Sequence, residues 1–269
     1  MAGAFFSSQN DMNSFVFLIF MSKDQKQHPE QTSKHRNRPS ISWDIHDAFG
    51  MTHFIVKSFK FVVQWAHEYG QAHPKMQGIF WIVMSVVFMI VPNLIGRSLT
   101  ETMGRNVASC ISLLIVIPFV FALQKEDARK ITSRNLLFMA LGGVSAATVF
   151  SLFMGNIEIN GDPASIPWLY YVVAVLYNSV LAPLYEEKLC RSLQLRGIQV
   201  IAGSLAAILL TSAIFGLAHK GNEMAMSVYA VILACMALYF RIGAIERAVA
   251  HGAYNFALDL HVFFLLLPV

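Results

Sequence analysis

Charged side chains are scarce in this chain. Asp, Glu, Lys and Arg make up only 13% of its 269 residues, and 56% of the residues are hydrophobic, whereas soluble domains carry about 25% charged residues. The formal net charge is +4, but the basic residues are spread over several short segments, so they do not form the patch that binding of nucleic acid requires. The composition therefore excludes a nucleic-acid partner and points to a membrane protein.

Cysteine is also rare. The three cysteines are Cys110, Cys190 and Cys235, and an odd number in or beside apolar segments indicates packing and no disulfide framework. A secretory signal peptide is not expected, because the apolar residues 15–21 are few and no basic segment precedes them.

The chain is rich in long apolar runs. Each approaches the ~20 residues with which a helix crosses a bilayer, whereas a membrane barrel would show shorter segments of alternating hydrophobicity. We therefore predict an all-α fold, a polytopic transmembrane helix bundle of about seven spans. The runs are residues 79–96, 106–124, 135–157, 163–185, 197–218, 224–240 and the mostly apolar 248–269.

The chain divides into three predicted parts. Residues 1–46 form a polar, flexible tail, residues 47–76 an amphipathic helix with a linker, and residues 77–269 the membrane domain. In the helix, apolar residues recur at helical spacing from Ile55 to Tyr69, while Lys57, Lys60 and His67 share the opposite face. Such a helix lies in the membrane interface or packs on the bundle, and the sequence leaves both options open.

Basic residues between the apolar runs predict the orientation. Lys and Arg are enriched in cytoplasmic loops, and residues 158–165 contain neither. This distribution predicts an integral multi-pass protein of the plasma or inner membrane with a cytoplasmic N-terminus. The residues counted after the runs are Lys125, Arg129, Lys130, Arg134, Lys188, Arg191, Arg196, Arg241 and Arg247.

Three polar clusters interrupt or end the apolar runs: residues 186–191 (EEKLCR), 215–219 (FGLAH) and 251–255 (HGAYN). An ionisable group at membrane depth costs roughly 2.5–3.5 kcal/mol on insertion scales, so such groups indicate a functional site. Small residues elsewhere, such as Gly142 and Gly143, predict close helix packing.

Helical spacing suggests different tasks for the two glutamates. Glu187 and Arg191 are four residues apart and can form an ion pair, while Glu186 is turned about 100° away and can face a cavity. One buried salt-bridge network that includes both glutamates is the structural alternative. Pro183, three residues before Glu186, is expected to open the helix there.

The two histidine clusters allow two interpretations each. His251 and Asn255 are four residues apart, so they can aim two hydrogen-bond donors at one oxygen, or can join helices across the bundle. His219 ends the fifth run, where a single histidine is more often interfacial. With a fourth helix ending at Arg196 and a fifth beginning at Gly203, Glu186 would lie about 15 Å and His219 roughly 24 Å from the helix ends.

The ordered motifs EExxxR, FxxxH and HxxxN resemble the CPBP family of CAAX proteases and bacteriocin-processing enzymes, also called Abi, which includes type II CAAX prenyl endopeptidase. The resemblance implies a glutamic intramembrane endopeptidase without cofactor or metal, acting on a membrane-associated protein or peptide in the bilayer, with a prenylated CAAX protein as one option. It implies that Glu186 activates a water, His219 holds it, and His251 and Asn255 stabilise an oxyanion, with Glu187 and Arg191 in support. Ser192 departs from the family's usual glycine, and Cys190 from a common aromatic residue.

Three other functions were weighed. A zinc protease would use Glu and His ligands, although no HExxH motif occurs. A non-catalytic protein of the same fold would act in bacteriocin immunity or in regulation of a partner. A secondary transporter would show inverted repeats, which the two halves lack, and Asp259, one turn after Asn255, has no assigned role.

Overall fold

The fold is all-α over the residues that the computed structural model describes, which are 45–124, 131–154, 168–220 and 222–265. The predicted fold class is confirmed, and every predicted apolar run has a helix. The predicted tail, up to residue 44, lies outside the described residues. The helices before the long central segment are α2 (Ile45–Ala72), α3 (Pro74–Met103), α4 (Arg105–Leu123) and α5 (Ser133–Met154), and those after it are α9 (Ser204–Leu217), α10 (Glu223–Leu238) and α11 (Ala244–Leu265).

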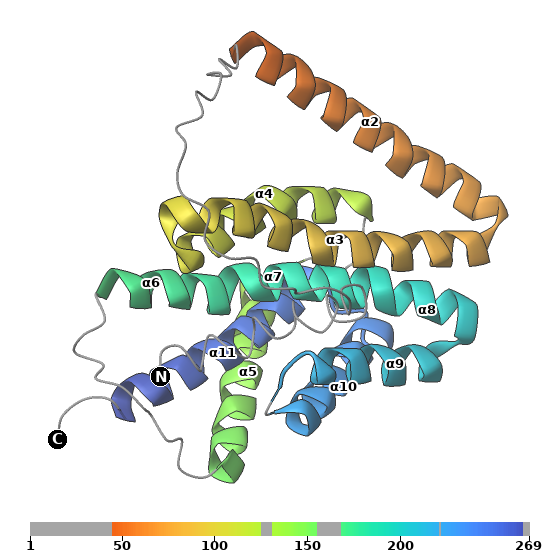
Figure 1. Ribbon diagram of the computed structural model, residues 1–269. Helices are drawn as coiled ribbons and strands as arrows, with labels where there is room; N and C mark the ends of the chain where they lie inside the picture. Colours follow the sequence, from red (N-terminus) through yellow and green to blue (C-terminus); the bar gives the residue numbers. More distant parts are fainter. Residues whose placement is uncertain (1–44, 125–130, 155–167, 221, 266–269) are drawn as a thin grey trace, which may run out of the picture.

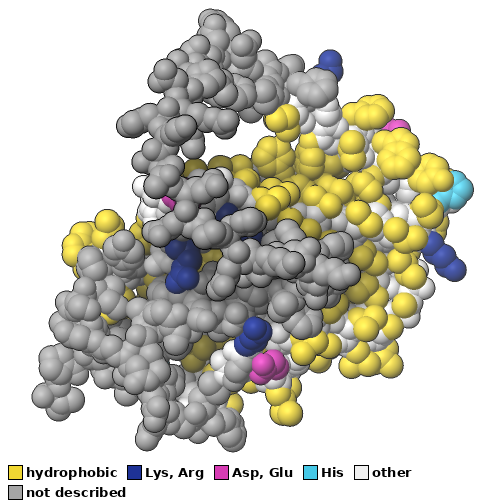
Figure 2. Space-filling model, in the orientation of Figure 1, with side chains coloured by type: hydrophobic (Ala, Val, Ile, Leu, Met, Phe, Trp, Pro, Cys, Tyr) yellow, Lys and Arg dark blue, Asp and Glu magenta, His cyan; other side chains and the backbone are white. Residues whose placement is uncertain are grey.

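Three helices are long and apolar enough to cross a membrane by length and composition. They are α3, α4 and the segment Ser133–Ser151 of α5, while α9 and α10 are apolar but shorter. Figure 2 shows the corresponding surface, on which hydrophobic side chains cover most of the described area and charged ones are isolated. The protein is a helical membrane protein; seven spans and a cytoplasmic N-terminus stay predictions.

One continuous helical segment crosses the centre of the molecule (Figure 1). It runs through α6 (Trp168–Leu176), η2 (Tyr177–Leu181), α7 (Ala182–Glu186), η3 (Glu187–Gln194) and α8 (Leu195–Ala202), where η2 and η3 are π-helical. π-Helical turns are rare in proteins overall, and those that occur are often found at functional sites. The predicted fifth run was wrong at its start, because residues 197–202 continue the central segment and Gly203, at a φ of 85°, ends it.

Pro183 accounts for part of this irregularity. Proline has no N–H to donate along the helix, and Pro183 lies at the junction of η2 and α7. The carbonyl of Asn178, five residues earlier, instead accepts a hydrogen bond from Asn255 Nδ2 in α11 at 2.8 Å. The expected opening of the helix beside the polar cluster is therefore present, and α11 fills the vacant bonding position.

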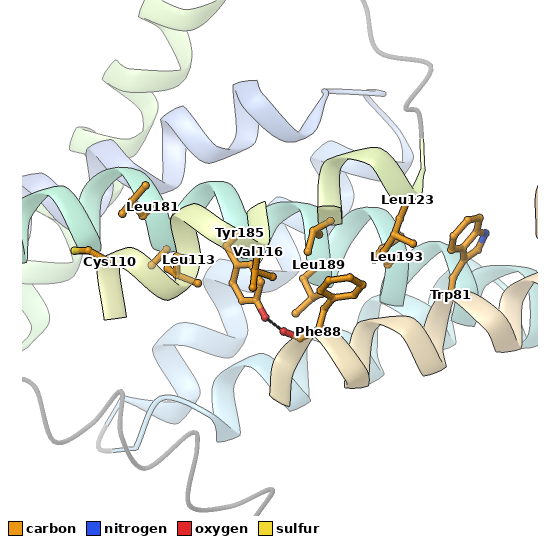
Figure 3. Packing of buried hydrophobic residues seen from close by; sticks show 12 residues of the cluster. Trp81, Phe88, Cys110, Leu113, Val116, Leu123, Leu181, Tyr185, Leu189 and Leu193 are labelled. Carbon is orange, nitrogen blue, oxygen red and sulfur yellow. Dashed lines mark hydrogen bonds between the residues drawn. The ribbon is translucent and has the colours of Figure 1, made fainter. Parts of the chain in front are cut away.

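The main hydrophobic core fixes one side of the central segment. Figure 3 shows Phe88 of α3, Val116 of α4 and Leu189 of η3 packed together with Tyr185. The Tyr185 hydroxyl donates a hydrogen bond to the Phe88 carbonyl. Because successive helical residues point in different directions, anchoring Tyr185 in this core turns the next two residues toward the other side, where α9, α10 and α11 lie.

Glycines allow α11 to approach its neighbours closely. A Cβ on Gly143 of α5 would lie 2.1 Å from the Ala250 carbonyl oxygen, and one on Gly252 would lie 2.1 Å from that of Ser179. The packing role predicted for Gly143 is confirmed, whereas the same prediction for Gly142 is wrong, since nothing lies within 4 Å of its Cβ position.

Helix α2 packs on the bundle through one face only. The Phe59 ring meets those of Phe88 and Phe119 edge-on, at centroid distances of 6.4 and 5.4 Å. Phe61 and Trp65 remain 69% and 50% exposed. Contact with the bundle is therefore observed, and a position in the membrane interface stays a prediction that the exposed aromatic side chains favour.

Candidate active site

Glu187 is the centre of a buried polar cluster. Its side chain is fully buried, and its Oε1 lies 3.5 Å from Arg191 Nη1 and 3.2 Å from His251 Nδ1. Its Oε2 accepts a hydrogen bond from Arg247 Nε at 3.3 Å. The predicted ion pair between Glu187 and Arg191 is present, and it is one part of a larger network.

Arg247 was not predicted to belong to this cluster. It was counted as a loop charge, but the structure buries it to 2% exposure, where it also donates to the Ile242 carbonyl and, at 3.4 Å, to Ser192 Oγ. Its position four residues before His251 could have revealed it, because that spacing places both on one face of α11. With Glu186 and Arg191, the cluster thus holds two carboxylates and two guanidinium groups, so its formal charges balance.

Lys188 requires the same correction. Its side chain is 3% exposed, and Nζ donates to the carbonyl of Gln124 at the end of α4 and lies 5.4 Å from the centre of the Phe121 ring. A cation at a helix C-terminus interacts favourably with the helix dipole. Lys188, Arg191 and Arg247 are all buried and are not loop charges, so the predicted orientation depends on the remaining basic residues.

Glu186 has surroundings unlike those of Glu187. Its Oε2 lies 3.8 Å from His251 Nε2, and its side chain keeps 8% of its surface exposed. Carboxylates only accept hydrogen bonds, so His251 donates from Nδ1 to Glu187, and Nε2 is left facing Glu186. One histidine therefore lies between two adjacent glutamates, of which Glu187 is fully buried and Glu186 keeps a small exposed fraction.

His219 joins the cluster from the end of α9. Its Nδ1 donates to the Phe215 carbonyl at 2.7 Å, and its ring packs on that of Phe215 at 4.4 Å between centroids. The Phe215 ring also lies 4.2 Å from Arg191 Cζ and 5.9 Å from the His251 ring. Phe215 thus connects the three motifs physically.

The helix ends explain why His219 and Glu186 meet. Residues 186 and 219 are nearly equally far in sequence from the turn at Gly203, 17 residues before it and 16 after it. At about 1.5 Å per residue they lie roughly 24–26 Å from that turn. The depth of about 15 Å expected for Glu186 was wrong because its helix ends at Ala202 and not at Arg196.

Asn255 is held beside the cluster. Its amide nitrogen bonds to the Asn178 carbonyl, and the Asn178 side chain bonds to the Asp259 carboxylate. Asp259 thereby acquires a partner in Asn178 of the central segment. The paired action of His251 and Asn255 on one oxygen stays a prediction.

A tyrosine on α10 completes the surroundings of His251. The Tyr229 ring of α10 lies edge-on to His251 at 5.7 Å and stacks on Tyr254 at 4.5 Å. Sequence reasoning missed Tyr229, although a phenol in the middle of an apolar run is itself a signal of a polar contact at membrane depth. Among the described residues, no group of three or more His, Cys, Asp or Glu is arranged to hold a metal ion.

These features define a class: a helical membrane protein with a buried cluster of carboxylates, guanidinium groups and histidines. Residues 167–257 match the family model described as type II CAAX prenyl endopeptidase Rce1-like. The match covers about a third of the chain and contains all three motifs, and it confirms the resemblance predicted from them. No curated protein and no solved structure matches the chain significantly.

Proposed function

We propose that this protein is an intramembrane endopeptidase of glutamic type that cleaves a membrane-associated protein or peptide. The observation that carries the proposal is the inequality of the two adjacent glutamates. Glu187 is fully buried with three partners, whereas Glu186 keeps 8% of its side-chain surface exposed and faces His251. A base must be reachable by water, and a carboxylate saturated by ion pairs is a poor one.

In the proposed reaction Glu186 removes a proton from a water molecule. The water oxygen attacks the carbonyl carbon of the scissile bond, and the carbonyl oxygen takes up the negative charge of a tetrahedral intermediate. The bond between carbon and nitrogen then breaks, and the proton held by Glu186 passes to the leaving amine. The products are a new carboxyl terminus and a new amino terminus.

His219 suits the task of orienting the water. Its Nδ1 proton is engaged by the Phe215 carbonyl, so in neutral imidazole Nε2 carries a lone pair and accepts a hydrogen bond. A water that donates to Nε2 of His219 would keep its other proton for Glu186, which lies within electrostatic range of this histidine.

His251 suits the task of stabilising the oxyanion when it is protonated. Since Glu187 engages Nδ1, Nε2 donates only in the imidazolium form, in which both ring nitrogens carry a proton. Asn255 is proposed as a second donor, and it would exchange its bond to the Asn178 carbonyl for one to the substrate.

The substrate is proposed to be embedded in or anchored to the bilayer. The cluster lies among apolar helices, and the matched family is named for endopeptidases of prenylated CAAX proteins. A prenylated chain ending in a CAAX sequence, in which the cysteine carries the lipid, is therefore the first substrate to test.

The test compares purified wild-type protein with Glu186→Gln in proteoliposomes. Prenylated and unprenylated peptides ending in a CAAX sequence serve as substrates, and mass spectrometry identifies the products. We expect Glu186→Gln to abolish cleavage. Glu246→Gln is the matched control, because Glu246 is a buried carboxylate that accepts bonds from Gly243 and Asn135 outside the cluster, and it should retain cleavage.

Full turnover by Glu186→Gln would refute the proposal. Loss of wild-type cleavage with a chelator, restored by zinc, would favour a zinc protease instead. Full biological activity of Glu186→Gln in cells would favour the non-catalytic regulator or immunity protein.

A further inference from the structure

Tyr229 has a buried hydroxyl without a hydrogen-bond partner among the described residues. The residue is 8% exposed and lies within electrostatic range of Glu187 and Arg191. Leaving a buried polar group unsatisfied costs about 1–3 kcal/mol, and buried tyrosine hydroxyls usually have a partner. Phenylalanine at this position would keep the ring contacts without that cost.

The ring of Tyr229 is firmly placed. It stacks on Tyr254 with an interplanar angle of 19° and meets His251 edge-on at 73°. These two ring contacts restrict its rotation, and the hydroxyl has a defined position near the cluster. A donor that is already oriented needs no reorganisation when charge develops in a reaction.

The proposed oxyanion site lacks such a donor. Asn255 is bonded to the Asn178 carbonyl, and His251 donates from Nε2 only when it is protonated, because Nδ1 is bonded to Glu187. A tyrosine hydroxyl keeps its proton at neutral pH and is a donor there without carrying a charge. It would be available without breaking an existing bond.

We propose that the Tyr229 hydroxyl donates a hydrogen bond to the carbonyl oxygen of the scissile peptide bond and stabilises the oxyanion that forms there. This role makes Tyr229 a catalytic residue, and it rests on the proposed endopeptidase function. The bond strengthens as the oxygen becomes negative, so its effect falls on the transition state more than on substrate binding.

Tyr229→Phe tests this role. Removal of one oxyanion donor lowers kcat by about 10²–10³-fold in other enzymes, and we expect a loss of this size with little change in KM. The Tm should be equal to or above that of the wild type, because only an unsatisfied hydroxyl is removed. Tyr254→Phe, which removes a hydroxyl from the stacked neighbour, should retain wild-type kcat.

Incorporation of 3-fluorotyrosine at position 229 is the conservative rescue. It keeps the ring and the donor, so kcat should stay within a few-fold of wild type. A Tyr229→Phe variant with wild-type kcat, or one whose defect lies in KM alone, would overturn the role of Tyr229 while leaving the endopeptidase intact. Absence of any cleavage that depends on Glu186 would overturn both.

Discussion

Removal of the Glu187 charge should destabilise the protein far more than removal of the Glu186 charge. Glutamine keeps the size and shape of either side chain, so both substitutions remove the negative charge and replace one acceptor oxygen with an NH2 group. The Glu187 carboxylate forms ion pairs with the guanidinium groups of both Arg191 and Arg247, whose side chains are 1% and 2% exposed. Glu187→Gln therefore leaves two buried cations without their common carboxylate.

The size of the effect follows from this burial. Breaking a buried ion pair by removing one partner costs about 3–5 kcal/mol. Each kcal/mol lowers Tm by about 2–4 °C in a domain of 150–250 residues, so the expected loss is roughly 6–20 °C. Glu186 Oε2 lies 3.8 Å from His251 Nε2, beyond the usual length of a hydrogen bond, so Glu186→Gln should melt within a few degrees of wild type.

Buried cysteines provide the assay. Cys110 and Cys190 are free and buried, so a dye that becomes fluorescent on reaction with thiols reports their exposure as the purified protein unfolds. The double variant Glu187→Gln/Arg247→Gln restores equal numbers of acidic and basic groups in the cluster and should recover part of the lost Tm. A wild-type Tm for Glu187→Gln would refute the conclusion that this carboxylate organises the cluster.

Two further predictions concern packing and orientation. Gly143→Ala should lower the free energy of unfolding by about 1–3 kcal/mol, as overpacking does. It should also reduce activity, because the added methyl group would collide with the carbonyl of Ala250 and so displace the neighbouring His251. Gly142→Ala, with open space around it, should raise stability by up to about 1 kcal/mol, and equal Tm values for the two variants would contradict the packing of α5 on α11. Single cysteines placed at positions 128 and 161 test the orientation with an impermeant thiol reagent in intact cells, and labelling at 161 but not at 128 is expected.

The sequence alone was sufficient for the fold class and for the local pairs. Long apolar runs favour helices because a helix satisfies its own backbone hydrogen bonds within a bilayer, and each run contains a helix within the described residues. The spacing of Glu187 and Arg191 predicted their ion pair, since residues four apart on a helix are neighbours. The three motifs predicted the family of the segment that contains them.

Only the tertiary structure decided which residues complete the cluster. Arg247 and Tyr229 reach it from α11 and α10, and no local spacing relates those helices to the glutamates of the central segment. The turn at Gly203 brings His219 to the depth of Glu186. Because Pro183 has no N–H to donate along the helix, the Asn178 carbonyl accepts a hydrogen bond from the Asn255 side chain instead. Periodicity shows which face of a helix is polar, but the packing of helices distant in sequence determines what that face meets.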